Sequence, residues 1–261
     1  MKAIILAAGK GTRLWKYTDN IPKCMLNFKG KTLIERQIVT LRSNGIDDIT
    51  IIKGYMAEKI NIPGIKYYTN KEYENTNMVY TLFCAEKELF GDVIVAYADV
   101  LYESRVLKGL INKKSDVAVV VDTNWQKYWI LRYGNINTDT ESLVLNSKGQ
   151  ILELGQSNAK KEKINGRYVG LIKFSSNGME KTKKIYKELK LNFWNKPWQR
   201  NQLFQKAYMT DLLNYLISAK IKVDAMKIKN GWLEFDTNED YEKIIELDRK
   251  HELEGLFVIN R

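Results

Sequence analysis

The stretch ILAAGKGTRL, residues 5 to 14, decides the fold of this 261-residue chain. Residues 2–7 are apolar enough to predict a buried strand, and a loop with two glycines, a threonine and two cations follows at once. Open α/β folds bind their ligands at the carboxyl ends of the strands, which is where such a loop lies. Glycines let backbone N–H groups approach a ligand, and arginine can hold phosphate through two parallel hydrogen bonds. The stretch therefore predicts a polyphosphate site after the first strand.

Two common phosphate loops do not fit this stretch. A dinucleotide fingerprint would place a third glycine at position 14, where the chain has Leu14. A Walker loop would need a glycine separated by four residues from a Gly-Lys pair, and that spacing is absent. On the loop alone, a plain tight turn stays an alternative.

The first half of the chain alternates between strand and helix patterns. The expected strands are 2–7, 49–53, 65–69, 92–99 and 116–122, and the expected helices are 32–44, 77–89 and 104–112. The helix at 32–44 opens on the capping box Thr32-Leu33-Ile34-Glu35 and stops at Gly45. Such alternation predicts an α/β fold: a Rossmann-like, mostly parallel sheet flanked by helices.

The second half of the chain changes pattern. Residues 142–174 predict short antiparallel strands, followed by helices at 177–190 and 207–219, strands at 222–228 and 232–236, and a closing helix at 238–253 capped by Asn238. We expect a single domain with an inserted β-rich lobe. Its parts are a nucleotide-binding half at 1–122, an acceptor lobe at 123–230, and a closing strand and helix at 231–261.

Composition narrows the chemistry. The net charge of +11 fits an anionic partner, but the lysines are scattered, which also fits a solvated lysine-rich surface. His251 is the only histidine and falls in a charged helical pattern, so histidine-dependent catalysis is not expected. Cys24 and Cys84 have no metal or redox spacing and are expected to be reduced. With no long apolar run and no secretory signal, we expect a cytoplasmic protein that does not bind membranes.

Several motifs together resemble one family. LAAGKGTRL, followed by IPK at 21–23, is similar to the signature of the nucleotidyltransferases that act on sugar phosphates and phosphocholine. The segments that resemble the cytidylyltransferase branch of this family are ENTNMVYTL (74–82), VAYADVLY (95–102), DTNWQKYWILRYGN (122–135), NGRYVGLIKFS (165–175), YMTDLL (208–213) and GWLEFDTNEDY (231–241). The resemblance covers nearly the whole chain and implies a GT-A-like nucleotidyltransferase fold.

The resemblance implies a reaction. An oxygen of a phosphate or phosphonate acceptor attacks the α-phosphorus of CTP, and pyrophosphate leaves. Because that oxygen is already anionic, the reaction needs positioning and charge neutralisation rather than a general base. The acceptors of the branch include phosphocholine, 2-aminoethylphosphonate and phosphoglutamine, and such products serve capsule or lipid decoration. The alternative within the family is a sugar-1-phosphate nucleotidyltransferase that makes an NDP-sugar.

The resemblance also assigns roles to residues. Arg13, Lys23, Asp99 and Asp236 are the implied catalytic residues, with Arg13 on the β- and γ-phosphates and Lys23 on the α-phosphate and the acceptor. Asp99 and Asp236, each at the end of a strand, are the implied ligands of Mg²⁺, and Glu234 is held in reserve. The implied nucleotide-binding residues are Leu6, Ala7, Ala8, Gly9, Gly11, Thr12, Arg13, Lys23, Asn77, Thr81 and Asp99. Asn77 fits a helix cap equally well, and Met78 replaces an asparagine of the family pattern.

The acceptor side is assigned more loosely. Its candidate residues are Trp125, Arg132, Glu141, Tyr168, Asp211 and Trp232. Aromatic residues among Trp125, Trp129, Tyr168, Trp194, Trp198 and Trp232 fit a cage for a quaternary ammonium group or, equally, core packing. The loop 192–202 is expected to cover the pocket, and one of Lys160, Lys161 and Lys163 to reach the acceptor phosphate.

Rival classes fit less well. A glycosyltransferase would carry Asp-x-Asp at the metal strand, whereas Tyr97 and Leu101 stand two residues from Asp99. A nucleic-acid-binding protein would explain the charge but not the loop, the Pro-Lys pair and the two acids at strand ends. The expected partners are therefore CTP and a small anionic acceptor, without nucleic acid, in a monomer or homodimer.

Overall fold

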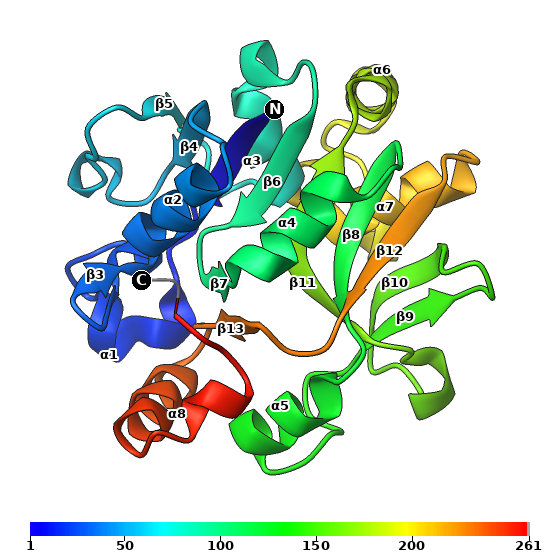
Figure 1. The fold of residues 1–261 in the computed structure, drawn as a ribbon. Helices are drawn as coiled ribbons and strands as arrows, with labels where there is room; N and C mark the ends of the chain where they lie inside the picture. The colour runs from blue at the N-terminus through cyan, green and yellow to red at the C-terminus, as the bar shows by residue number, and fades with distance from the viewer. Residues whose placement is uncertain (260–261) are drawn as a thin grey trace.

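The computed structural model describes residues 1–259, and a seven-stranded sheet lies at the centre of this part of the chain (Figure 1). Its order is β12 (Val223–Ile228), β8 (Val117–Asp122), β11 (Arg167–Phe174), β6 (Val93–Tyr97), β1 (Lys2–Ala7), β4 (Ile49–Lys53) and β5 (Lys66–Thr69). Neighbouring strands are parallel except at β11, which runs antiparallel to both β6 and β8. The mostly parallel α/β sheet predicted from the sequence is confirmed.

Helices cover both faces of the sheet. One face packs on α2 (Leu33–Ser43) and α4 (Ser104–Asn112), and the other on α3 (Met78–Cys84), α6 (Ser176–Phe193) and α7 (Met209–Ser218). The two clusters of buried side chains explain why β1 and β8 are apolar at almost every position, since neither face of these strands meets water. The predicted capping box of α2 is present: Thr32 caps the helix and the Glu35 carboxylate bonds back to the Thr32 N–H.

The carboxyl edge of the sheet is built from the smaller elements. There β7 (Val100–Tyr102) pairs with β13 (Trp232–Glu234), while α1 (Trp15–Thr18), α5 (Trp125–Tyr133) and α8 (Asn238–Arg249) lie along this edge in Figure 1. The pairing of β7 with β13 brings the late part of the chain to the end of β6. Two hairpins complete the fold: β2 (Asn27–Phe28) with β3 (Lys31–Thr32), and β9 (Glu141–Leu145) with β10 (Ile151–Ser157).

Several sequence predictions were wrong in detail. The helix expected at 77–89 ends at Cys84 and continues only as a 3₁₀ turn, because the chain turns back at Ala85 to enter β6. The strand expected at 92–99 ends at Tyr97, so Asp99 lies in the turn before β7. The cap of α8 is Thr237 rather than Asn238, since the Thr237 side chain accepts from the Asp240 N–H. Helix α5 was not predicted.

The expected β-rich lobe is smaller than predicted. Of the strands expected within 142–174, only the β9–β10 hairpin stands apart, packed on α7. Strand β11 belongs to the central sheet, where almost every residue is buried. A strand buried on both faces is typical of the centre of a sheet. A single sequence does not show that β11 is buried in this way, so its place in the central sheet could not be predicted.

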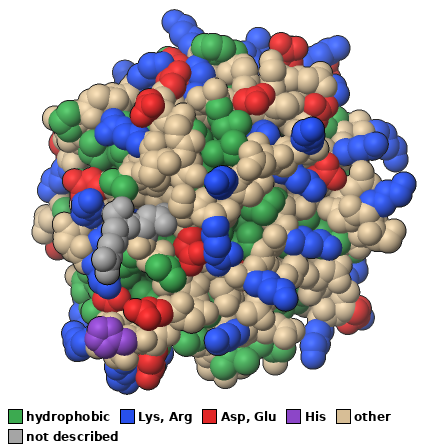
Figure 2. Space-filling view, in the orientation of Figure 1, with side chains coloured by type: hydrophobic (Ala, Val, Ile, Leu, Met, Phe, Trp, Pro, Cys, Tyr) green, Lys and Arg blue, Asp and Glu red, His purple; other side chains and the backbone are tan. Residues whose placement is uncertain are grey.

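The surface carries its charge in a dispersed form. Figure 2 shows Lys and Arg side chains spread among Asp, Glu and apolar groups on the visible face. This face therefore fits the solvated lysine-rich surface better than a dense anion-binding patch. Within residues 1–259, none of the helices is long and apolar enough to cross a membrane.

Candidate active site

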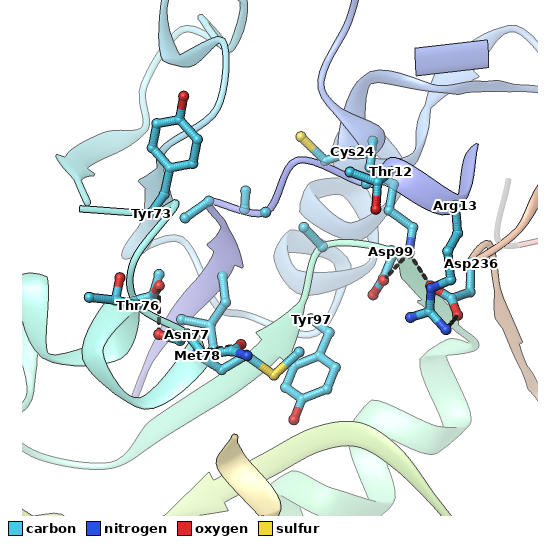
Figure 3. A pocket seen from close by; sticks show the side chains of 18 residues that line it. Thr12, Arg13, Cys24, Tyr73, Thr76, Asn77, Met78, Tyr97, Asp99 and Asp236 are labelled. Carbon is cyan, nitrogen blue, oxygen red and sulfur yellow. Dashed lines mark hydrogen bonds and ion pairs between the residues drawn. The ribbon is translucent and has the colours of Figure 1, made fainter. Parts of the chain in front are cut away.

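A cavity of about 250 Å³ lies at the carboxyl edge of the sheet, beside the glycine loop (Figure 3). The residues around it come from the end of β1 and the loop after it, the turn at 23–24, the segment that leads into α3, α3 itself, and the ends of β6 and β13. Its lining residues are Leu6, Ala7, Ala8, Gly9, Gly11, Thr12, Arg13, Lys23, Cys24, Tyr73, Thr76, Asn77, Met78, Thr81, Tyr97, Ala98, Asp99 and Asp236. Every residue expected to bind nucleotide or metal is in this set.

Glycines give the loop its shape. Gly11 has a φ of +64°, and a Cβ there would lie 3.0 Å from the Lys23 Cβ. Glycine avoids both the backbone strain and the contact, which lets Lys23 lie directly under the loop. Gly54 has the same function from outside the motif, because a Cβ there would come within 2.5 Å of the Ala8 carbonyl oxygen. Sequence reasoning missed Gly54, which lies after β4 in an ordinary-looking turn.

Four charged groups meet at one end of the cavity. The Lys23 Nζ lies 2.5 Å from an Asp99 carboxylate oxygen and 2.8 Å from an Asp236 oxygen. The second Asp236 oxygen lies 2.8 Å from an Arg13 guanidinium nitrogen. Burial acts to lower the Lys23 pKa, but the two carboxylates outweigh it and raise that pKa. Burial acts to raise the pKa of Asp236, and Lys23 and Arg13 reverse this, so the carboxylate stays ionised.

Backbone and buried side chains hold the two carboxylates in place. The Phe235 N–H donates to the Asp99 carbonyl oxygen at 3.0 Å, which ties the two acidic turns together. The buried Gln37 amide donates to the carbonyls of Tyr97 and Val100, on either side of Asp99. Neither contact can be read from the local sequence, because Gln37 lies on α2 among apolar neighbours.

The two carboxylates fit a divalent cation. Asp99 and Asp236 come within hydrogen-bond distance of one ammonium group, so they flank a single cation-sized position. Carboxylate oxygens are the protein ligands that Mg²⁺ prefers, and it takes one or two of them beside phosphate oxygens and water. Within residues 1–259 there is no cluster of three or more acidic, histidine or cysteine side chains that could hold a metal unaided. The donor set therefore suits a metal that arrives with a phosphorylated ligand.

The α3 side of the cavity is already hydrogen-bonded. Asn77 caps α3, and its side-chain oxygen accepts from the Met78 N–H. The buried Thr81 hydroxyl donates to the Asn77 carbonyl and accepts from the Asn70 amide. The helix-cap interpretation of Asn77 is thus correct, and base recognition by Asn77 and Thr81 stays a prediction. Tyr73, at the cavity wall, was missed by sequence reasoning.

Cys24 lines the cavity without being a nucleophile candidate. Burial raises the pKa of its thiol to about 12, which keeps it protonated near neutral pH. His251 is exposed in the turn after α8 and does not line the cavity. These two residues leave the chemistry of the cavity to its cations and carboxylates.

The residues expected on the acceptor side divide into two groups. Trp125 and Trp232 are 3% and 2% exposed, and the Trp232 indole N–H donates to Asp122 at 2.8 Å, so both are core residues rather than walls of a cage. Trp129 is also buried. Lys160, Lys161 and Lys163 lie outside the set that lines the cavity.

The remaining acceptor candidates lie around the same edge of the sheet. The Tyr168 hydroxyl donates to the hydroxyl of Tyr97, a cavity residue, at 3.0 Å. Burial raises the Glu141 pKa, opposed chiefly by the charge of Arg167. The Asp211 carboxylate, in the first turn of α7, accepts from the Tyr208 N–H and pairs with Arg200, at 2.7 Å, from the loop expected to cover the pocket. Arg167 and Arg200 were not predicted.

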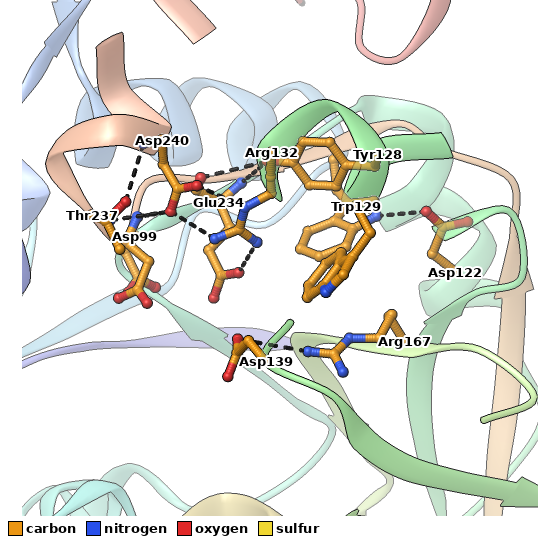
Figure 4. A network of polar contacts seen from close by, with 12 residues as sticks. Asp99, Asp122, Tyr128, Trp129, Arg132, Asp139, Arg167, Glu234, Thr237 and Asp240 are labelled. Atoms are coloured by element: carbon orange, nitrogen blue, oxygen red, sulfur yellow. Dashed lines mark hydrogen bonds and ion pairs between the residues drawn. The ribbon is translucent and has the colours of Figure 1, made fainter. Parts of the chain in front are cut away.

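Arg132 is held in the tightest network of this edge (Figure 4). Its guanidinium donates twice to Asp240, at 2.8 and 2.6 Å, and once to Glu234, at 2.6 Å. Asp240 in turn accepts from the N–H groups of Asp236 and Thr237. Arg132 therefore supports the turn that carries Asp236, rather than offering free donors to a ligand.

Comparison with known proteins places this site in a family. Residues 3–157 match the family described as the MobA-like NTP transferase domain. A CTP:phosphoglutamine cytidylyltransferase of Campylobacter jejuni is 36% identical over 94% of this chain and 100% of its own length. A choline-phosphate cytidylyltransferase of Streptococcus pneumoniae is 34% identical over 58% of this chain and 67% of its own length.

A solved structure agrees in fold. The CTP:phosphocholine cytidylyltransferase structure from Streptococcus pneumoniae superposes with a TM-score of 0.71, at 24% identity, over 94% of this chain and 98% of that one. The two chains therefore share the sheet and its flanking helices over nearly their whole lengths.

Proposed function

This chain belongs to the MobA-like NTP transferase family and is a nucleotidyltransferase, and we propose that it is a Mg²⁺-dependent cytidylyltransferase. Its reaction transfers CMP from CTP to a small phosphorylated or phosphonate acceptor and releases pyrophosphate. The observation that carries the proposal is the meeting of Arg13, Lys23, Asp99 and Asp236 beside the glycine loop. The full-length similarity to a cytidylyltransferase supports CTP as the nucleotide.

The residues of the cavity suit a displacement at phosphorus. An anionic oxygen of the acceptor forms a bond to the α-phosphorus of CTP, the bond to the β-phosphate oxygen breaks, and pyrophosphate carries away the electron pair. No proton has to be removed from the nucleophile. This agrees with the described lining of the cavity, which contains no histidine and whose one thiol, that of Cys24, is protonated. Charge neutralisation in a preorganised site then supplies the rate enhancement.

Each cation of the cavity has a task in this proposal. Lys23, 13% exposed and raised in pKa, would hold the α-phosphate and the acceptor oxyanion together. Arg13 has a side chain 67% exposed and can swing from Asp236 to the β- and γ-phosphates. The backbone N–H groups of the loop would line the triphosphate. Triphosphate oxygens thus replace carboxylates as the partners of both cations.

Asp99 and Asp236 would hold Mg²⁺ once Lys23 turns to the phosphates. When bound, the ion supplies charge neutralisation of the triphosphate. The two carboxylates, fixed by Gln37 and by the Asp99–Phe235 backbone bond, set its place relative to the loop.

The use of the product and the location of the enzyme in the cell are also part of the proposal. A product with CMP joined to a small phosphoryl group is a donor for decorating a surface polysaccharide or lipid, and CTP supply places the enzyme in the cytoplasm.

Pyrophosphate release tests the proposal. The protein is incubated with Mg²⁺, each of the common nucleoside triphosphates, and either an amino-alcohol or amino-acid phosphate or glucose 1-phosphate. We expect turnover with CTP and an amino-bearing acceptor, and none without Mg²⁺. A preference for UTP or dTTP with glucose 1-phosphate would instead identify a sugar-1-phosphate nucleotidyltransferase.

A further inference from the structure

A second arginine of the acceptor side has an unusual environment. Arg167 is 6% exposed, and within residues 1–259 its side chain makes no hydrogen bond. Its Nη1 is fully buried without a partner, and its nearest carboxylate, that of Asp139, lies 3.9 Å from Nη2. The guanidinium lies over the Trp129 ring, 4.0 Å from the ring centre. A buried guanidinium with free donors is costly unless something binds it.

Arg132 shows what a structural arginine looks like in the same place. Both arginines are buried and both lie on Trp129, but Arg132 uses three donors on carboxylates at 2.6 to 2.8 Å. Within the described part of the chain, the fold therefore gives hydrogen-bond partners to the Arg132 guanidinium but not to the Arg167 guanidinium. Burial lowers the Arg167 pKa, and nearby carboxylates only partly oppose this.

Arg167 lies at the same edge of the sheet as the cavity, although it is not among the residues that line it. Arg167 is the first residue of β11, which runs antiparallel to β6 and β8, so it lies at the edge where those strands end. Its neighbour Tyr168 bonds to Tyr97 of the cavity wall. The negative charge of Glu234, two residues before Asp236, also acts on Arg167. In Figure 4 Arg167 and Asp139 face the Arg132–Glu234 pair, with Trp129 beside them.

Charges of both signs surround this position. Glu141 and Asp139 lie close enough to act electrostatically on Arg167. A free guanidinium fork suits a carboxylate, which it can hold with two parallel hydrogen bonds. Carboxylates beside it suit an ammonium group. An amino acid presents these two groups next to each other.

We propose that Arg167 binds the carboxylate of the acceptor, so that the enzyme selects a phosphorylated amino acid over a phosphorylated amino alcohol or choline. This inference rests on the proposed function and goes beyond it, because it assigns the acceptor class and the residue that selects it. The phosphoryl end of the acceptor then lies toward Lys23, and the amino-acid end toward Arg167 and Glu141.

A matched pair of acceptors tests the inference. O-phosphoserine and phosphoethanolamine differ only in the carboxylate, and phosphocholine adds a quaternary ammonium group. kcat/KM is measured for each with CTP and Mg²⁺ in the wild type, Arg167→Met and Arg167→Lys. We expect the wild type to prefer O-phosphoserine, and Arg167→Met to lose roughly 10- to 100-fold on it with little change on phosphoethanolamine. Arg167→Lys should recover part of the loss.

Lys173→Met is the matched control. Lys173 is a buried cation of the same strand, 7% exposed, but it lies at the far end of β11 and donates to the carbonyls of Ile111 and Lys113. Its loss should lower stability without changing the ratio between the two acceptors. Equal losses on both acceptors in Arg167→Met would overturn the inference and leave Arg167 with a structural role.

Binding separates this inference from the proposed function. Calorimetry measures O-phosphoserine and phosphoethanolamine binding to the wild type and to Arg167→Met without nucleotide. If CTP gives no turnover with any acceptor, the proposed function fails, while tighter binding of O-phosphoserine that depends on Arg167 still supports the carboxylate site. If the wild type binds or uses both probes equally well, the carboxylate site is wrong even where cytidylyl transfer is observed.

Discussion

The charged side chains differ in their pairing between the proposed nucleotide side of this edge, around Lys23, and the proposed acceptor side, around Arg132 and Arg167. On the nucleotide side, Lys23, Asp99, Asp236 and Arg13 satisfy one another across short distances. On the acceptor side, Arg132 makes three hydrogen bonds to carboxylates, while Arg167, whose guanidinium lies over the same indole, makes none within residues 1–259. In a site for a highly charged ligand, ion pairs within the protein can hold the charged side chains in place until the ligand takes over one partner of each pair. In a site that selects one small group, a single hydrogen-bond donor can be left without a partner in the protein.

The largest expected effect contrasts the two arginines directly. Arg132→Met leaves the Asp240 and Glu234 carboxylates without their cation, so it should cost about 3–5 kcal/mol of unfolding free energy. Arg167→Met removes no hydrogen bond and should cost less than about 1 kcal/mol. Urea unfolding of the two variants measures the difference. An equal loss of unfolding free energy in the two variants would show that Arg167 also has a structural partner, and the contrast between the two arginines would then be wrong.

The next effect concerns the exchange of ion pairs on the nucleotide side. Lys23→Met should lower kcat by about 10²- to 10³-fold, because a preorganised positive charge next to the reacting phosphates is lost. Lys29→Met is the control: Lys29 pairs with Asp248 on the surface and does not line the cavity. Pyrophosphate release measures both. A Lys23 variant as active as the Lys29 variant would rule out the proposed role of Lys23.

A smaller effect tests how Asp99, the proposed metal ligand, is held. Gln37→Met leaves the buried carbonyls of Tyr97 and Val100 without their donor, which should cost about 1–3 kcal/mol of stability. Because these carbonyls flank Asp99, the variant should also need several-fold more Mg²⁺ for half-maximal activity. The Mg²⁺ dependence of pyrophosphate release separates positioning from simple destabilisation, since a purely structural role would leave it unchanged.

The smallest effect is a pH dependence on the acceptor side. Burial raises the Glu141 pKa, so the folded state favours the protonated carboxyl more than the unfolded state does. Above the folded pKa the ionised group therefore costs stability, and below the unfolded pKa it does not. Glu141→Gln should raise Tm slightly at pH 8 and leave it unchanged near pH 3.5. A lower Tm at pH 8 would show that the electrostatic attraction to Arg167 outweighs the cost of burying the Glu141 carboxylate.

Most of the nucleotide side could be predicted from the sequence. The loop at 9–13 follows an apolar strand, Asp99 and Asp236 follow two others, and Lys23 comes directly after a proline. Strands β1 and β6 are parallel and end at one edge, so the loop and Asp99 meet there. Asp236 reaches the same edge because β13 pairs with β7, which directly follows Asp99. The structure places Lys23 and Asp236 in contact across 213 positions of sequence.

The acceptor side could be predicted only in part. Tyr168, Glu141 and Arg132 do come to this edge, but Trp125 and Trp232 are core residues. An aromatic residue in a single sequence gives no sign of whether it covers a core or a ligand. Arg167 was not predicted, because a single sequence does not show which arginine is buried without a hydrogen-bond partner.

The sequence by itself determined the alternation of strands and helices, the glycine loop and the acids that follow the strands. These features depend on local periodicity and on residue types next to strand ends, which are present in any short window. Only the tertiary structure decided which buried charges have partners. Arg132 bonds to Asp240, which is 108 positions away in the sequence, whereas Arg167 Nη1 has no hydrogen-bond partner among the described residues. Partnership between buried charges depends on distance in space and on desolvation, and neither quantity exists until the sheet, its loops and α8 have come together.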